Sequence, residues 1–283
     1  MTKGRNRLFG DKAFYLMVLS IALPIAIQNG ITNFVNLLDN VMVGRIGTEE
    51  MSGVSIANQL IFVFNLCIFG TVSGAGIFGA QFFGKKDEEG VRTTTRFKIA
   101  SGALIIILFT SLFLLSGESL ISLFLTGDND GGDKAKTLYH AMSYLRIMIL
   151  GLPGFALTQA YSSTLREGGE TVLPMKAGLA AIFTNLIFNW ILIFGNLGAP
   201  KLGSNGAAIA TVISRYVEFL LIAGVSFKKR EEYPYLKGLW KTFRMEHKLL
   251  LRILKAASPL IMNETLWSLG MTALMQCYST RGL

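Results

Sequence analysis

Long stretches without a charged side chain constrain this chain more than any other feature of its sequence. Five of them run uncharged for 19 to 33 residues, over 13–38, 51–83, 99–117, 147–165 and 177–200. An α-helix needs about 20 residues to cross a bilayer, and each stretch is of that order or longer. Two further apolar stretches contain charge: 202–227 holds Arg215 and Glu218, and 256–280 holds Glu264. The pattern predicts seven membrane-spanning helices.

The composition favours a chain whose solvent is lipid. Hydrophobic residues make up 51% of the 283 residues and charged residues only 16%, whereas soluble domains carry about 25% charged residues. The apolar runs lack the alternation of a membrane β-barrel, and the first run is too long for a cleaved signal peptide. We therefore expect an all-α polytopic membrane protein.

Basic residues are distributed unevenly between alternate loops. The N-terminal segment and the loops after the second, fourth and sixth predicted helices hold 20 Lys and Arg, and the other loops hold five. Because cytoplasmic loops are enriched in Lys and Arg, this asymmetry predicts a multi-pass protein of the cell membrane with a cytoplasmic N-terminus. The net charge of +9 is then a topology signal, so no nucleic-acid partner is expected.

Membrane lipid is the expected partner of the most basic loop. The segment 228–255 holds nine Lys and Arg together with several large apolar side chains. Such a segment can lie along a membrane surface and attract anionic lipid. The apolar side chains expected to face the membrane are Leu236, Leu239, Trp240 and Phe243.

An internal repeat divides the chain. Leu19-x-x-Ala22-x-Pro24 in the first span recurs as Leu254-x-x-Ala257-x-Pro259 at the start of the seventh. Six spans separate the copies, so the two repeats are expected to be parallel, as in the halves of some secondary transporters. The expected organisation is a six-helix transmembrane lobe over 1–227, a cytoplasmic basic linker over 228–255, and the first helix of a truncated second lobe over 256–283.

The sequence contains no recognisable pattern of an enzyme site. Cys67 and Cys277 lie inside apolar spans and predict neither a disulfide nor a metal site. The G-x-G-x-x-G pattern at 74–79 lies within an apolar span and has no strand before it, as dinucleotide binding would require. We expect no enzymatic activity and no cofactor, apart from Na⁺ or H⁺ as a coupling ion.

A carboxylate near the end of the first span is the clearest functional candidate. A charge inside a bilayer costs about 2.5–3.5 kcal/mol, yet Asp39 follows Asn29, Asn33 and Asn36 and precedes Asn40. These asparagines share one helix face with Asp39 beside it, and such a stripe must face protein or a water-filled cavity. The alternative is that Asp39 is an interfacial residue that begins the next loop.

Polar residues of the fifth and sixth spans could complete a cation site. Asn185 and Asn189 are one helical turn apart, and Thr211 follows in the next span. Their oxygens are hard ligands, so together with Asp39 they could hold Na⁺ or a proton. The alternative for each is a hydrogen bond between helices.

The seventh span carries a second carboxylate. Glu264 follows Pro259 by five residues, and the proline frees backbone groups and kinks the helix. We interpret Glu264, with Asn33 and Asn36, as lining a central pathway for substrate or coupling. A hydrogen bond from a protonated Glu264 is the alternative. Arg215 and Glu218, three residues apart, are predicted to form an internal ion pair.

Several segments of this sequence resemble the multidrug and toxic compound extrusion (MATE) transporters. The resemblance covers the whole chain as the N-terminal lobe plus the seventh helix of that family. It is carried by the following segments: Leu-Asp-Asn-Val-Met-Val-Gly at 38–44, Gly-Leu-Pro at 151–153, Leu-Arg-Glu-Gly-Gly-Glu-Thr at 165–171, Asn-Leu-Ile-Phe-Asn-Trp at 185–190, Gly-Ala-Pro-Lys-Leu-Gly at 198–203 and Gly-Ala-Ala-Ile-Ala-Thr at 206–211.

The resemblance implies a two-lobe antiporter of twelve helices. Such a protein exports cationic or amphipathic organic compounds against a Na⁺ or H⁺ gradient by alternating access. By the same resemblance, Asp39, Asn185, Asn189 and Thr211 would form the cation site, which could hold Na⁺, and Glu264 would serve coupling. Some relatives carry Asp where Asn189 stands, which leaves the choice of coupling ion open.

A second departure and two alternatives accompany this interpretation. The chain stops before a complete second lobe, and because alternating access needs two lobes we do not expect it to transport alone. A lipid-linked oligosaccharide flippase of the same superfamily is one alternative, although only Arg146 and Arg215 lie in the spans to meet a pyrophosphate. A membrane-embedded enzyme or a non-transporting structural fragment is the other.

Overall fold

The computed structural model describes residues 11–125, 133–240 and 247–280, and its regular elements are helical throughout. The helices are α1 (Lys12–Gly44), α2 (Thr48–Lys85), α3 (Glu88–Ser122), α4 (Lys134–Ile149), α5 (Leu152–Glu167), α6 (Val172–Phe194), α7 (Ser204–Lys228) and α8 (His247–Thr280), with short 3-10 turns at Leu123–Leu125, Asn196–Gly198 and Pro234–Leu236. The predicted all-α fold is confirmed.

Local sequence explains where several helices begin and end. Asp11, Asp87 and Asp133 each precede a helix and accept hydrogen bonds from backbone N–H groups of its first turn, which satisfies donors that have no partner inside the helix. Gly195 ends α6 at φ +74°, a left-handed conformation that glycine adopts without strain.

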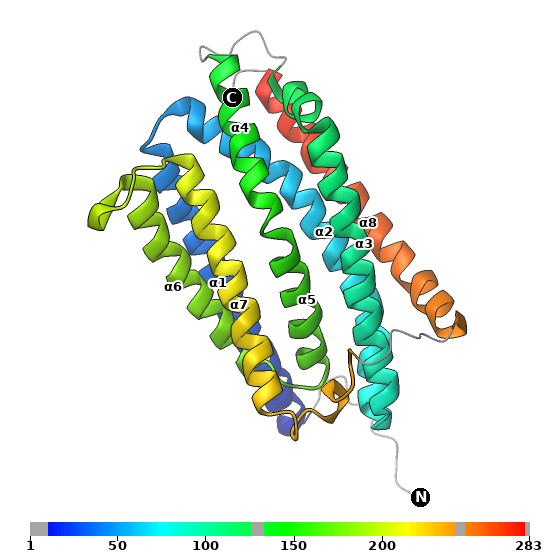
Figure 1. Cartoon of the computed structure of the whole chain (residues 1–283). Coiled ribbons are helices and arrows are strands. Elements are labelled where there is room, and N and C mark those ends of the chain that lie inside the picture. The colour runs from blue at the N-terminus through cyan, green and yellow to red at the C-terminus, as the bar shows by residue number, and fades with distance from the viewer. Residues whose placement is uncertain (1–10, 126–132, 241–246, 281–283) are drawn as a thin grey trace, which may run out of the picture.

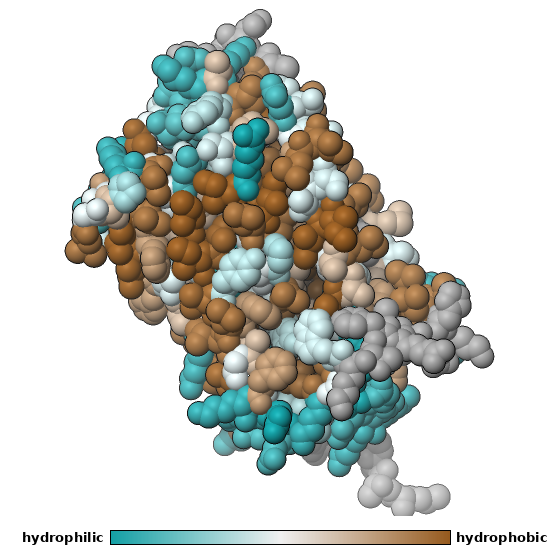
Figure 2. Space-filling view, viewed as in Figure 1, coloured by the Kyte–Doolittle hydropathy of each residue, from teal (hydrophilic) through white to brown (hydrophobic). Residues whose placement is uncertain are grey.

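Most of the predicted spans correspond to helices that could cross a membrane. Within the described residues, α2, α3, α6, α7 and the Lys12–Ile31 part of α1 are long and apolar enough to do so. Figure 2 shows the corresponding surface, with hydrophobic side chains across the middle and hydrophilic side chains gathered at both ends. The seventh predicted span is helical, in α8, but α8 does not reach the same apolar threshold, and it begins at His247 rather than near 256.

The fourth predicted span, 147–165, is wrong as a single helix. The chain forms two helices there, α4 and α5, which meet at an angle of 48° around Leu150 and Gly151. Pro153 lies in the first turn of α5, where its missing N–H does no harm, but it could not continue α4. Counting uncharged residues cannot detect this break, because Leu150, Gly151 and Pro153 are all uncharged.

The helices pack as two groups, and the bent pair of α4 and α5 lies between them. In Figure 1, α1, α6 and α7 lie together on one side, α2, α3 and α8 on the other, and α4 and α5 run between them. The core between α2, α3 and α5 is aromatic: the Phe64 ring packs edge-on against Phe109 at 5.5 Å, and Phe109 packs in the same way against Phe113. On the other face of α2, Gly74 lies directly against Ala257 of α8.

The two ends of the bundle differ in charge. We call the end at which α1 begins and α2 ends the basic end, because it holds Lys12, Lys85, Lys86, Arg92 and Lys228. The opposite end, where α6 ends and α7 begins, is called the far end. In Figure 1 the basic end is at the bottom.

The segment after α7 turns inward at the basic end. Leu236 and Leu239 are buried with Tyr235 in one cluster with side chains of α3, α5 and α6, and burial raises the pKa of the Tyr235 hydroxyl. The prediction that Leu236 and Leu239 face a membrane surface is therefore wrong. Trp240 is half exposed, and Phe243 lies outside the described residues.

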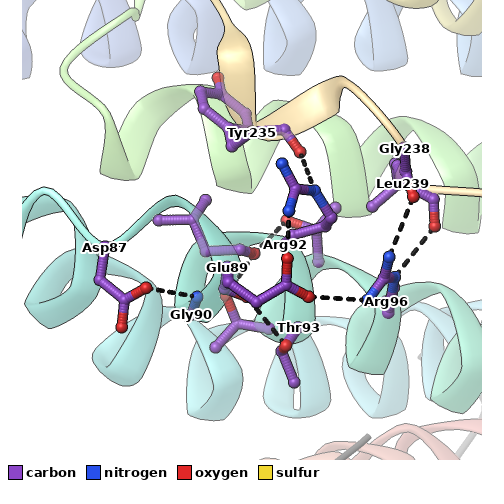
Figure 3. A network of polar contacts seen from close by, with 12 residues as sticks. Asp87, Glu89, Gly90, Arg92, Thr93, Arg96, Tyr235, Gly238 and Leu239 are labelled. Carbon is purple, nitrogen blue, oxygen red and sulfur yellow. Dashed lines mark hydrogen bonds and ion pairs between the residues drawn. The ribbon is translucent and has the colours of Figure 1, made fainter. Parts of the chain in front are cut away.

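Two arginines of α3 hold this segment in place (Figure 3). Arg92 donates to the carbonyl oxygens of Pro234 and Tyr235, at 3.4 and 3.2 Å. Arg96 donates to those of Gly238 and Leu239, at 2.9 and 3.0 Å, and Glu89 pairs with both guanidinium groups. Backbone carbonyls 142 or 143 residues away in the sequence thus satisfy these arginines, which explains why apolar periodicity alone misplaced the segment.

Replacing Arg96 with alanine is expected to release the segment 234–239 from α3. The variant loses two charge-assisted hydrogen bonds, which lowers the local opening free energy by about 2–3 kcal/mol. Hydrogen exchange measured by mass spectrometry should show faster exchange there and unchanged exchange in α6 and α7. Arg252→Ala, an exposed arginine of α8, is the control. Unchanged exchange in 234–239 would show that the apolar contacts alone hold it.

Candidate cation site

Three helices bring the predicted cation-site residues together near the far end. Asp39 comes from the last turns of α1, Asn185 and Asn189 from α6, and Thr211 from α7. The α6 and α7 helices approach closely because Gly206 faces the backbone of Leu192. A side chain on α7 therefore reaches α6, and α6 in turn packs against α1.

The four side chains form a continuous hydrogen-bonded chain. Asn189 Nδ2 donates to Asp39 Oδ1 at 2.6 Å and to Asn185 Oδ1 at 3.0 Å. Asn185 Nδ2 lies 3.2 Å from Thr211 Oγ1, which itself donates to the carbonyl of Ala207. The alternative that Asp39 begins a loop is wrong, because Asp39 lies within α1 and binds α6.

The Asn185 amide can take two orientations in this chain. With its oxygen and nitrogen exchanged, Nδ2 donates to both Asp39 oxygens, at 3.0 and 3.1 Å, and Oδ1 accepts from Thr211 Oγ1 at 3.2 Å. The exchange changes which atom faces the carboxylate without moving the helix backbone. In either assignment Asn185 is hydrogen-bonded to Thr211, and in the exchanged one it also donates to Asp39.

One buried oxygen in the cluster has no hydrogen-bond partner. Asn189 is only 1% exposed, and its Oδ1 is buried without a donor, on the same amide group whose Nδ2 donates to Asp39. Buried polar atoms are normally paired, so an orphaned oxygen suggests a missing positive ligand. One carboxylate, two amide oxygens and a hydroxyl are the oxygen ligands that a hard cation prefers, and these residues fit Na⁺ or a proton on Asp39.

Tyr144 and Asn58 extend the cluster, and the sequence interpretation missed both. The Tyr144 hydroxyl, from α4, donates to Asn58 Oδ1 of α2 at 3.3 Å, and the buried ring lies close enough to interact with Asp39 and Thr211. Tyr144 lies outside the predicted fourth span, and nothing in its local sequence marks it as polar and buried. Only the position of α4 identifies it.

Two of the remaining asparagines of α1 can be placed relative to this cluster. Asn29 and Asn40 are exposed, so the asparagine stripe as a whole is not gathered around Asp39. The side chains of Asn33, Asn36 and Glu264 lie outside the described part of the structure. In that described part, no three His, Cys, Asp or Glu side chains form a metal cluster, so a cation here would depend on amide and hydroxyl oxygens around one carboxylate.

The predicted ion pair between Arg215 and Glu218 is wrong. It is not among the ion pairs formed by the described residues. The Arg215 guanidinium instead lies over the Phe155 ring of α5, 5.1 Å from its centre. A spacing of three residues places the two side chains on one side of α7, but the long arginine stem reaches across to the neighbouring helix.

Comparisons with known proteins agree with this helical membrane fold. A model of the MatE family matches residues 24–191. The chain is 28% identical over 240 residues to the "Probable multidrug resistance protein NorM" of Thermotoga maritima, which spans 83% of this chain and 49% of that protein. It is 28% identical over 258 residues to the "Probable multidrug resistance protein YoeA" of Bacillus subtilis, covering 89% of this chain and 53% of that protein.

Solved structures share the fold. A crystal structure of MATE in complex with MaD3S superposes with a TM-score of 0.78 at 21% identity, over 90% of this chain and 55% of that one. The chain spans about half the length of the curated relatives it matches. Because the family model matches more than half of the residues, and the relatives and the fold agree with it, this chain belongs to the MatE family of MATE multidrug efflux transporters.

Proposed function

We propose that this chain is the cation-binding lobe of a cation-coupled antiporter that exports cationic or amphipathic organic compounds. The observation that carries the proposal is the cluster of Asp39, Asn185, Asn189 and Thr211, with its unpartnered buried oxygen. The multidrug resistance relatives support the substrate class. The protein would lie in the cell membrane with the basic end in the cytoplasm, since cytoplasmic segments are rich in Lys and Arg.

A second lobe is the partner that transport requires. Alternating access moves two lobes against each other around one site, and this chain spans about half of its relatives. In this proposal, residues 1–227 form one lobe, 228–255 link the lobes, and 256–283 begin the second. The contact of Ala257 in α8 with Gly74 in α2 would then be part of the surface between the lobes.

Cation binding would act through the amide groups. Without a cation, N–H groups of Asn189, and of Asn185 in one orientation, face the Asp39 carboxylate. A Na⁺ ion requires oxygens in their place, whereas a proton adds one donor to the carboxyl group and leaves its other oxygen as an acceptor. Either ion would change the hydrogen bonds between Asp39 and the amides, and with them the contact of α1 with α6. This change is how the ion would bias one state of the lobe.

The proposal is tested by following Trp190, which is next to Asn189 on α6, in the purified chain. The chain has three tryptophans, so Trp240 and Trp267 are replaced with phenylalanine to isolate its fluorescence. We expect Asp39→Asn to weaken the response to Na⁺ or to pH by about tenfold or more, because the charged ligand contributes at least 1.4 kcal/mol. A response to Na⁺ at fixed pH identifies sodium, and a response to pH alone identifies the proton.

The control removes the same charge elsewhere. Asp11→Asn changes an exposed carboxylate that caps α1 at the basic end, and it should respond as the parent does. An Asp39→Asn variant that still responds like the parent, or a parent that responds to neither ion, would overturn the proposal. In a two-lobe transporter that contains this lobe, Asp39→Asn should abolish gradient-driven efflux while membrane insertion is retained.

A further inference from the structure

Partly buried charged side chains continue from the cation site toward the basic end. On α7, Arg215 follows Thr211 by one turn and Glu218 comes about one turn later. Arg166, at the end of α5, donates from Nη2 to Gln28 Oε1 of α1 at 3.0 Å. Glu218 interacts electrostatically with both arginines. The lobe interior thus carries charge well beyond Asp39.

On α1, α6 and α7 the residues of the cation site lie nearer the far end, and the residues around Gly178 lie nearer the basic end. Gln28 precedes Asp39 by eleven residues on α1, and Gly178 precedes Asn189 by eleven on α6, each a rise of about 16 Å. Gln28 and Glu218 both lie against Gly178. Polar side chains therefore follow one another from Asp39 to the basic end, and Arg215 lies between Asp39 and Glu218.

Arg215 is held in this position by packing, and its interaction with Glu218 is electrostatic without a direct ion pair. Its guanidinium lies over Phe155 at 5.1 Å, and its stem runs beside Gly151 and Gly154 of α5, where a Cβ would meet it at 3.4 and 3.6 Å. Its Nη1 is buried and has no hydrogen-bond partner. A partly unneutralised positive charge is thus fixed across the polar interior.

A fixed arginine blocks cations in two ways. It repels Na⁺ through a low-dielectric interior, where charge interactions are strong. It also does not pass on a proton, because arginine does not deprotonate in proteins. By contrast, Tyr144, which interacts with Asp39, and Asn58, which accepts from Tyr144, are neutral and would not oppose a cation.

We propose that Arg215 is a cation barrier inside this lobe, so that a cation bound at Asp39 does not pass through the lobe interior to the basic end. The inference rests on the proposed function of Asp39. In an antiporter such a barrier prevents the gradient from dissipating through the lobe without exchange of substrate. Release of the cation on the basic side then depends on the movement of the two lobes against each other.

The test measures uncoupled cation flux through the full 283-residue chain in liposomes, with no organic substrate present. Radioactive sodium uptake and an internal pH-sensitive dye report Na⁺ and H⁺ separately. Arg215→Gln is expected to raise the flux of one of them by about tenfold or more, and Arg215→Met, which preserves the apolar contact with Phe155, should do the same. Arg215→Lys keeps the charge and should stay near the parent.

Two further variants identify the route and the specificity of the effect. Arg146→Gln removes an exposed arginine of α4 and should not change the flux. The double variant Arg215→Gln with Asp39→Asn should return to the parent flux, because the leak passes through Asp39. Gel filtration and thermal melting confirm that each variant is folded, and Arg215→Met supplies the measurement if Arg215→Gln does not fold.

The outcomes separate the barrier from the proposed function. If Asp39→Asn abolishes the ion response of Trp190 but both neutral Arg215 variants show the cation flux of the parent, the proposed barrier is wrong and the proposed cation site stands. A leak that persists in the double variant, or one as large in Arg215→Lys, also overturns the barrier. If Asp39→Asn leaves the Trp190 response intact, the proposed function itself fails.

Discussion

Replacing Lys98 with methionine is expected to lower the free energy of unfolding by about 3–5 kcal/mol, the largest stability effect predicted for this lobe. The Lys98 side chain is fully buried, and its Nζ donates to Glu167 Oε1 at 2.5 Å and to the hydroxyls of Ser163 and Thr164 at 3.1 and 3.2 Å. Removing the ammonium leaves the Glu167 carboxylate buried without its counter-charge.

The surroundings of Glu167 leave it little room to find another partner. Its Oε2 is already buried without a hydrogen-bond donor, and the side chain lies against Gly76 and Gly79 of α2. A buried charge that loses its partner keeps its desolvation cost, whereas removing both charges is often nearly neutral. The double variant Lys98→Met with Glu167→Gln should therefore recover most of the lost stability.

The measurement is unfolding of the purified chain in mixed micelles with increasing SDS. Lys85→Met, which removes an exposed lysine at the end of α2, is the matched control and should change the free energy by less than about 0.5 kcal/mol. If Lys98→Met were as stable as this control, or if the double variant were no better than the single one, the ion pair would not hold α3 against α5.

Replacing Gly206 with valine is expected to destabilise the chain by about 3 kcal/mol. A Cβ at this position would lie 2.6 Å from both the carbonyl carbon and the oxygen of Leu192 and 3.0 Å from the nitrogen of Ile193. These are backbone atoms of α6 and cannot rotate away, so α7 must separate from α6. The separation also moves Thr211 away from Asn185, and the ion response of Trp190 should weaken together with the stability.

Gly224→Val is the matched control for this substitution. Gly224 lies on the same helix, and nothing lies within 4 Å of the position where its Cβ would be. The control carries the same change of helix propensity from glycine to valine without the clash. Thermal melting of both variants separates the two effects, and equal melting temperatures would show that α6 and α7 do not depend on a close approach at Gly206.

The sequence predicted the helices well because helix formation in a membrane depends on local features. Runs of uncharged residues identified α1, α2, α3 and α6, and an apolar run that contains two charges identified α7. The aspartates directly before α1, α3 and α4 cap these helices. The same counting placed Lys98 and Arg96 in a loop, although both are buried within α3. A charge ends an uncharged run even where a distant partner allows the helix to continue.

The candidate site was only partly predictable. Asp39, Asn185, Asn189 and Thr211 were identified from their chemistry and from the family resemblance, and the structure brings them into one hydrogen-bonded chain. Their roles stay proposals. Tyr144 was not predicted, because its local sequence shows no sign of burial beside Asp39.

The sequence by itself determined that this chain forms a helical membrane lobe, where most of its helices lie, and which carboxylate near the end of α1 is unusual. Only the tertiary structure decided that α4 and α5 break at Gly151, that Arg215 turns to Phe155 rather than to Glu218, and that Leu236 and Leu239 face inward. The reason is physical: helices are selected by neighbours along the chain, whereas the partner of a buried charge or amide is selected by which helices pack together.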